Sequence, residues 1–167
     1  MLKYIFLVSF ISTIAFAQDV NQKYQDTTSG KWHLIGKTTL EAFEDTTYSW
    51  WFNSETENYE VDTALVIPIK DKIQNYDITI IMGTWCSDSR REVPRVIKIL
   101  NYLNYDVSKI KIINVNRAKS GGDVDIKEYD VKLVPTIIFY KDGEEKGRIE
   151  EAPKLMLEDD LVEIVKS

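Results

Sequence analysis

Residues 77–94 read DITIIMGTWCSDSRREVP, an apolar run followed by a polar segment that leads into a helical pattern. The isoleucine-rich run from Asp77 to Met82 predicts a buried β-strand. From Ser87 to Asn104 apolar residues recur at helical spacing, with basic residues on the opposite face, which predicts an amphipathic helix. Cys86, the only cysteine of the chain, stands at the junction, where the first backbone N–H groups of a helix lack partners within the helix.

Further strands and helices are expected on both sides of this stretch. The four-residue spacing of Leu65, Ile69 and Ile73 predicts a helix kinked at Pro68. Alternation of strand and helix predicts a parallel core, to which a closing hairpin adds an antiparallel edge. The sequence therefore predicts an α/β fold with a central mixed sheet flanked by helices. The remaining expected elements are a strand over Ile110–Val115, a short helical stretch over Asp123–Asp130, hairpin strands over Thr136–Tyr140 and Glu145–Glu150, and a helix from Leu157 to Lys166.

The chain is expected to begin with a signal peptide. Lys3 precedes an apolar run, and Ala15-Phe16-Ala17 has the small-x-small pattern that signal peptidase accepts. Because the run is shorter than the roughly 20 residues that span a bilayer, we expect cleavage without stable membrane insertion. The mature protein is then exported, to the periplasm or the medium. The expected organisation is a signal peptide (1–17), an N-terminal extension (18–58) and a main domain (59–167).

The extension itself has no clear periodicity. Residues 18–31 are polar and predict a flexible lead-in, whereas 32–59 predicts irregular or short-stranded structure. Its aromatic side chains either form a ligand platform or pack on the main domain. Packing is the favoured interpretation, because aromatic side chains dominate core energetics. These side chains are Trp32, Phe43, Tyr48, Trp50, Trp51 and Phe52.

Composition narrows the possible functions. With 44% hydrophobic and 29% charged residues, the chain suits one globular domain. The formal net charge of −6 argues against a binder of nucleic-acid phosphates. One histidine, His33, and one cysteine allow neither a zinc site built from several Cys and His nor an internal disulfide, so we expect no metal and no cofactor. His33 lies more than fifty residues before Cys86, and we expect it to have no catalytic role.

The environment predicted for Cys86 favours a reactive sulfur. Unpaired N–H groups and the positive end of the helix dipole favour the thiolate over the thiol. Arg90 and Arg91 add to this effect, while Asp88 and Glu92 oppose it. The alternative is a buried structural cysteine, since free cysteine packs as a small hydrophobe. The polar run that follows Cys86 argues against burial.

Three short motifs resemble the thioredoxin superfamily. Trp85-Cys86, followed by Ser89 and then Pro94, is similar to the family's Trp-Cys-x-x-Cys motif and its helix-kinking proline. The other two are Val134-Pro135-Thr136, which resembles the cis-proline loop, and Lys141-Asp142-Gly143-Glu144, which resembles the hairpin turn. The likeness covers about residues 62–167 and implies a thioredoxin-like fold for the domain at 59–167. It is closest in character to exported bacterial thioredoxin-like proteins with an N-terminal extension.

The resemblance also implies site residues. Cys86 is the expected nucleophile, with Ser89 beside it, and Trp85, Val134 and Pro135 are expected to bind substrate. We expect Pro135 to be cis and to lie against Cys86. Two departures from the family affect the chemistry: Ser89 replaces the resolving cysteine, and Ile80 replaces a buried aspartate that assists proton transfer.

Two functions of different classes remain open. In the first, Cys86 carries out thiol–disulfide exchange with protein or low-molecular-weight thiols, and an external thiol resolves the adduct. In the second, the domain is a non-catalytic binding or chaperone-like module. Peroxide reduction with Thr84 near the thiol is a third possibility that no motif supports.

Overall fold

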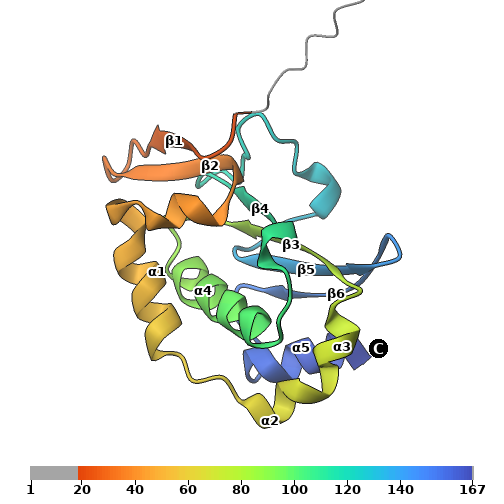
Figure 1. Cartoon of the computed structure of the whole chain (residues 1–167). Helices are drawn as coiled ribbons and strands as arrows, with labels where there is room; N and C mark the ends of the chain where they lie inside the picture. The colour runs from red at the N-terminus through yellow and green to blue at the C-terminus, as the bar shows by residue number, and fades with distance from the viewer. Residues whose placement is uncertain (1–18, 167) are drawn as a thin grey trace, which may run out of the picture.

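The computed structural model describes residues 19–166, so the expected signal peptide lies outside the described residues. A six-stranded sheet has the order β1-β2-β4-β3-β5-β6 (Figure 1). Only β3 and β4 pair in parallel, and every other pair is antiparallel. The α/β fold with a mixed sheet is confirmed, although its parallel part is a single pair. The strands are β1 (Gln22–Gln25), β2 (Trp32–Thr38), β3 (Asp77–Met82), β4 (Lys111–Asn114), β5 (Thr136–Lys141) and β6 (Glu144–Glu150).

The helices of the main domain lie at positions close to those predicted. The helix expected over residues 65–73 is broken into α2, η2 and α3, with Pro68 in the 3-10 segment. The helical stretch expected near residue 126 is reduced to one 3-10 turn, η4. The helices are α1 (Thr46–Asn58), α2 (Thr63–Val66), α3 (Lys70–Ile73), α4 (Ser87–Tyr102) and α5 (Leu157–Lys166), and the 3-10 turns are η1 (Leu40–Glu44), η2 (Ile67–Ile69), η3 (Val107–Lys109) and η4 (Lys127–Tyr129).

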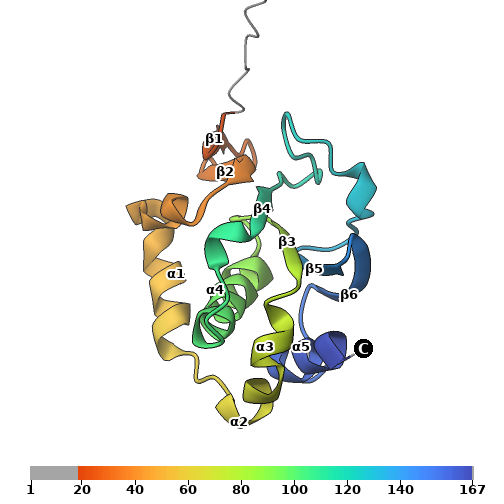
Figure 2. The same ribbon diagram turned by 45° about the vertical axis from the view of Figure 1, so that its right-hand side comes forward.

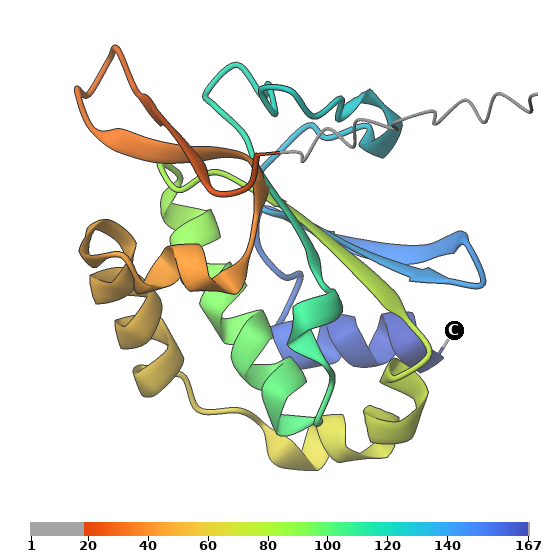
Figure 3. The ribbon, with the colours of Figure 1, turned by 45° about the horizontal axis from the view of Figure 1, so that its top comes forward.

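The two faces of the sheet bury different clusters. Successive strand residues point to opposite faces, so Ile80 of β3 joins the main core with α4 and α5, while Ile81 joins a smaller cluster. The same division separates Phe139 from Ile138 in β5. Figure 3 shows α4 and α5 on one side of the sheet and the segment between β4 and β5 beyond the other. A strand buried on both faces explains the near-continuous isoleucine run of β3.

The N-terminal extension is regular structure. β1 corrects the expectation of a flexible lead-in over 18–31, and β2 agrees with the short-stranded alternative for 32–59, whereas α1 in the same segment was not expected. β1 and β2 form a hairpin, and β2 pairs with β4, with Gly36 opposite Asn114. A helix, α1, follows, and the Asp45 carboxylate caps it by accepting the Thr47 N–H at 2.8 Å. Its helical pattern is hidden in the sequence because Trp50 points to solvent, 64% exposed.

Polar contacts fasten α1 to the main domain. Arg95 of α4 pairs with Glu55 at 2.7 Å, and the Lys98 ammonium donates to the Tyr59 carbonyl at 2.6 Å. The Tyr59 hydroxyl in turn donates to the buried Glu158 of α5 at 2.7 Å. In Figure 2, α1 runs beside α4 along its length. The extension therefore packs as part of one body with the rest of the fold.

The aromatic residues of the extension divide into two groups. Phe43, Tyr48 and Trp51 are buried in the main core, which confirms the packing interpretation for them. Trp32 and Trp50 are instead more than half exposed. Within residues 19–166, no helix is long and apolar enough to cross a membrane.

We expect Phe43→Ala to destabilise the protein by about 3–5 kcal/mol, because it empties a buried site. The Phe43 ring is 2% exposed and stacks on Phe52 with a centroid distance of 4.8 Å. The measurement is urea unfolding followed by circular dichroism. Trp50→Ala, which removes an exposed ring, is the control and should change the free energy of unfolding by less than about 0.5 kcal/mol. Equal losses for the two variants would contradict the packing described for the extension.

Candidate functional site

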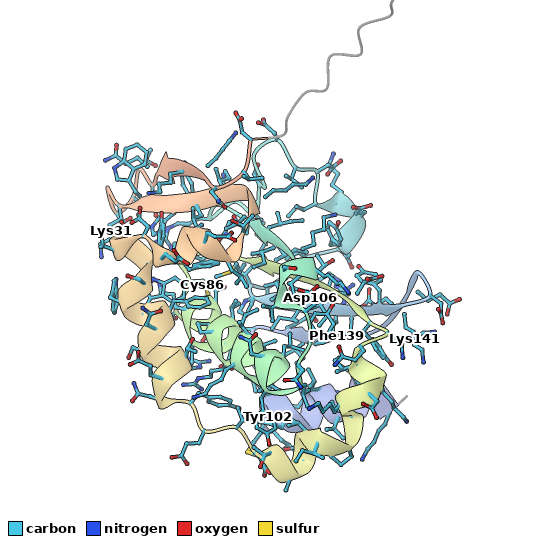
Figure 4. The ribbon with its side chains drawn as sticks, viewed as in Figure 1. Lys31, Cys86, Tyr102, Asp106, Phe139 and Lys141 are labelled. Atoms are coloured by element: carbon cyan, nitrogen blue, oxygen red, sulfur yellow. The ribbon has the colours of Figure 1, made fainter. Side chains whose placement is uncertain are left out.

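Cys86 is the N-cap residue of α4, directly after the loop that leaves β3. Cys86 is a partly exposed residue, and its sulfur lies 3.2 Å from the Val134 carbonyl oxygen, to which the S–H donates. The Asp88 carboxylate is 4.0 Å from the sulfur on the other side. Figure 4 shows Cys86 at the end of α4 that faces the sheet. The predicted position at a strand–helix junction is confirmed.

The loop before β5 supplies the wall opposite the sulfur. The Val134–Pro135 peptide bond is cis, and both residues are buried. The expectation that Pro135 is cis is therefore confirmed, and the Val134 contact places its loop against Cys86. In the part of the chain that the structure describes, the Val134 N–H donates to no backbone carbonyl.

Ser89 lies beneath the site and not on its surface. The residue is 0% exposed, and its hydroxyl oxygen accepts the Gly83 N–H at 3.2 Å. Ser89 thus braces the loop between β3 and α4. Ile80 is also fully buried and belongs to the main apolar core, so this position offers no group that exchanges protons.

Trp85 is held by the groups around its ring. Its indole N–H donates to the Val115 carbonyl at 2.7 Å, and the Arg117 guanidinium lies 4.9 Å from the ring centroid. Arg117 also donates to the Asp26 carboxylate at 2.7 Å, and this bond holds the pKa of Asp26 well below its usual range. Gly83 makes room for the ring, because a Cβ there would stand 2.5 Å from the indole nitrogen.

The structure thus brings Cys86, Val134 and Pro135 together, with Trp85 adjacent and Ser89 below. Among the described residues, no group of three or more His, Cys, Asp or Glu is placed to hold a metal ion.

A family model described as Thioredoxin matches residues 70–167, more than half of the chain. The chain belongs to the thioredoxin family.

The solved structures that match the chain include two with low sequence identity to it. One is a protein of unknown function from Pseudomonas aeruginosa, with a TM-score of 0.48 and 14% identity, covering 77% of this chain and 87% of that one. Another is the oxidized form of mitochondrial thioredoxin 3 from Saccharomyces cerevisiae, with a TM-score of 0.38 and 18% identity, covering 60% of this chain and 88% of that one. No curated protein matches the chain.

His33 contacts the loop between β3 and α4, although it lies more than fifty residues before Cys86 in the sequence. Its Nδ1 is 3.2 Å from the Thr84 hydroxyl oxygen, which also accepts the Leu34 N–H at 3.2 Å. The Arg90 side chain donates to the Thr84 carbonyl at 2.6 Å. Because the Thr84 hydroxyl is engaged on the side of β2, it is not free to assist the thiol. No pattern within the sequence signals these contacts, which depend on where β2 pairs.

Burial is the main cause of a lowered pKa at His33, and the positive charge of Arg90 adds to it. Arg117 and Lys31 act in the same direction, whereas Asp26, whose carboxylate lies 3.9 Å from Nε2, opposes them. His33 is 4% exposed, so the folded protein favours the neutral ring.

We expect the free energy of unfolding to fall as the pH is lowered from 7.5 to 5.5. Unfolded His33 binds a proton near its ordinary pKa of about 6.5, whereas the folded chain resists protonation until lower pH. The unfolded state then holds more protons, and stability declines by at most about 1.4 kcal/mol per pH unit. Urea unfolding at several pH values measures this slope.

The matched variant is His33→Gln, which keeps a polar side chain but does not titrate. Its stability should vary less over this range than that of the wild type, whatever its absolute value. The Asp26 carboxylate does not interfere, since a lowered pKa costs stability only below the ordinary aspartate range. Identical slopes for the two proteins would show that His33 is not the titrating group.

Proposed function

We propose that this protein carries out thiol–disulfide exchange through Cys86 alone. The observation that supports the proposal is the position of Cys86, a partly exposed residue at the N-terminus of α4 whose sulfur lies against the Val134 carbonyl of the cis-proline loop. The first N–H groups of a helix have no partners within the helix and can donate to a group bound at its N-terminus. A fold of the thioredoxin family supplies the scaffold, but the chemistry rests on this one sulfur.

The reaction consists of two exchanges. Cys86 first gives up its S–H proton and the hydrogen bond to Val134, and its thiolate attacks one sulfur of a disulfide. A mixed disulfide forms with Cys86, and the other sulfur leaves as a thiolate. An external thiolate then attacks the mixed disulfide, which restores Cys86 and transfers the disulfide to the incoming thiol. No net electrons are gained or lost by the protein over the cycle.

Ser89 is the reason that the proposed reaction requires an external thiol. In the position where the family has its resolving cysteine, this chain carries a hydroxyl that is buried and bonded to the Gly83 N–H. A serine hydroxyl does not displace a thiol from a mixed disulfide, because the exchange requires a thiolate. The adduct on Cys86 therefore persists until a second molecule arrives.

The substrate is a disulfide. The site favours one that lies in an extended polypeptide, or one formed from a small thiol compound. The Val134 N–H and carbonyl lie beside the sulfur, where strand-like hydrogen bonds to a peptide are possible. Trp85 is partly exposed next to the same loop. We also propose export to an oxidising compartment, based on the signal-like pattern of residues 1–17; the mass of the mature protein tests this directly.

We expect Ser89→Cys to gain dithiol activity. Residues 86 and 89 are neighbours in the first turn of α4, close enough for a disulfide. A second thiol there can resolve a mixed disulfide within the same molecule. The assay is insulin reduction with dithiothreitol, in which the variant should exceed the wild type several-fold. Ile80 still leaves the site without the family's buried acid, so turnover should remain slow.

The controls separate exchange from simple binding. Cys86→Ala should abolish both insulin reduction and the mixed disulfide that the wild type forms with glutathione disulfide, as followed by mass spectrometry. Thiol counting verifies that the Ser89→Cys variant forms its 86–89 disulfide. If that bond forms and the variant is still no faster than the wild type, the site is not an exchange site, and the protein is then better described as a binding module.

A further inference from the structure

A pocket of about 330 Å³ has Thr84 and Arg90, from either side of Cys86 in the sequence, among its lining residues, but neither Cys86 nor Val134. It lies where β2 and α1 of the N-terminal extension meet the start of α4, near Lys31 in Figure 4. Thr84 and Arg90 form its inner side, and the extension supplies the rest. We call it the extension pocket. It is lined by Lys31, Trp32, His33, Thr47, Tyr48, Trp50, Trp51, Thr84 and Arg90.

The charge of the extension pocket has one sign. Its lining includes Lys31 and Arg90 and no carboxylate, although the chain as a whole carries a net charge of −6. His33, the remaining titratable ring, favours its neutral form because burial lowers its pKa. A cationic pocket in an acidic protein attracts small anions.

Arg90 is the group in this pocket that most needs a partner. Its Nε donates to the Thr84 carbonyl, but within residues 19–166 no carboxylate lies within ion-pairing distance of its guanidinium. The other arginines behave differently: Arg95 pairs with Glu55 and Arg117 with Asp26. Arg90 is also partly buried, and burial lowers its pKa. A partly buried cation without a counter-charge is unfavourable, and a bound anion relieves this.

Aromatic rings form the walls of the pocket. Trp32 is 53% exposed on β2, and Trp50 is 64% exposed on α1. Tyr48 and Trp51, both buried, lie behind them. The core does not require the two exposed indoles, which leaves flat apolar surfaces open to a ligand at the edge of a cationic pocket.

We propose that the extension pocket binds a small organic anion that carries an aromatic ring, such as an arylalkyl carboxylate. The carboxylate lies against Arg90 with Lys31 nearby, and the ring lies against the exposed indoles. The volume of about 330 Å³ is at the small end of the range for ligand pockets, about 300–1,000 Å³, and suits a ligand of this size. Cys86 does not line the pocket, so the proposed binding requires no reaction at its sulfur.

The probe is phenylacetate, titrated into ¹⁵N-labelled protein while the tryptophan indole N–H signals are followed by NMR. The signals of Trp32, Trp50 and Trp51 should shift with saturation, and that of Trp85, outside the pocket, should move least. Phenylacetamide, which has the same shape without charge, should bind at least tenfold more weakly. Acetate, which has the charge without the ring, should also bind at least tenfold more weakly.

Variants locate the two contacts. Arg90→Gln should weaken phenylacetate binding at least tenfold, and Trp50→Ala and Lys31→Gln, which change exposed side chains, should weaken it about threefold or more. Arg91→Gln is the matched control, because Arg91 pairs with Asp88 and does not line the pocket; its affinity should equal that of the wild type.

Cys86→Ala keeps the pocket and should bind phenylacetate as the wild type does, whether or not the exchange activity exists. Equal affinity for phenylacetate and phenylacetamide would overturn the proposal. So would unchanged binding in both Trp50→Ala and Lys31→Gln, since these variants do not depend on the loop that Arg90 braces.

Discussion

The pairing of β3 on both sides is the constraint on which the rest of this structure depends. β3 runs parallel to β4 and antiparallel to β5, so the carboxyl ends of β3 and β4 and the start of β5 meet at one edge of the sheet. Met82 lies opposite Asn114, and Ile81 lies opposite Thr136. The loop that leaves β3 therefore emerges beside Val115 and Val134. For this reason Trp85 bonds to the first and Cys86 to the second.

The N-terminal extension builds a second feature on the same loop. By adding β2 to the free side of β4, it carries His33 to Thr84 and places α1 along α4. One side of the loop then presents a sulfur to the cis-proline segment, and the other side presents a partly buried guanidinium to an aromatic pocket. Arg90, whose backbone N–H bonds to the Cys86 carbonyl and whose side chain bonds to Thr84, connects the two. The same loop thus lies between the sulfur and the extension pocket, the two sites to which functions are proposed above.

The site keeps the geometry of the thioredoxin family while it lacks two of the groups that make a dithiol reductase. The residue in the resolving position, Ser89, serves the fold by accepting the Gly83 N–H. The position of the buried acid, Ile80, is part of an unbroken apolar core. Neither change disturbs the cis-proline loop. Cys86 and the cis-proline loop are therefore retained, and under the proposed exchange reaction the chain lacks the means of completing a cycle by itself.

How much of this was visible in the sequence depends on the range of the interactions involved. β3 was predicted from its short apolar run, and α4 from apolar residues that recur on one helical face. The hairpin of β5 and β6 was predicted from its Asp-Gly turn, where Asp142 and Gly143 adopt positive φ angles. Cys86 at the strand–helix junction followed from the same local patterns. The cis Pro135 was foreseen only through the resemblance to a family.

Other features were decided by tertiary structure alone. The segment of α1 has no strong apolar stripe, because its tryptophans divide between the core and the pocket, so its sequence does not identify it as a helix. His33 reaches Thr84 because β2 pairs with β4. This pairing joins distant parts of the chain, as the hydrogen bond between Asn114 and Thr38, 76 residues apart, shows. The pocket around Arg90 depends on the same pairing, since β2 forms part of its lining. Strand pairing between distant segments is set by backbone hydrogen bonds common to all residues. The sequence by itself therefore determined most elements of the main domain and the position of Cys86, and only the folded chain decided the structure of the extension and which residues surround the sulfur.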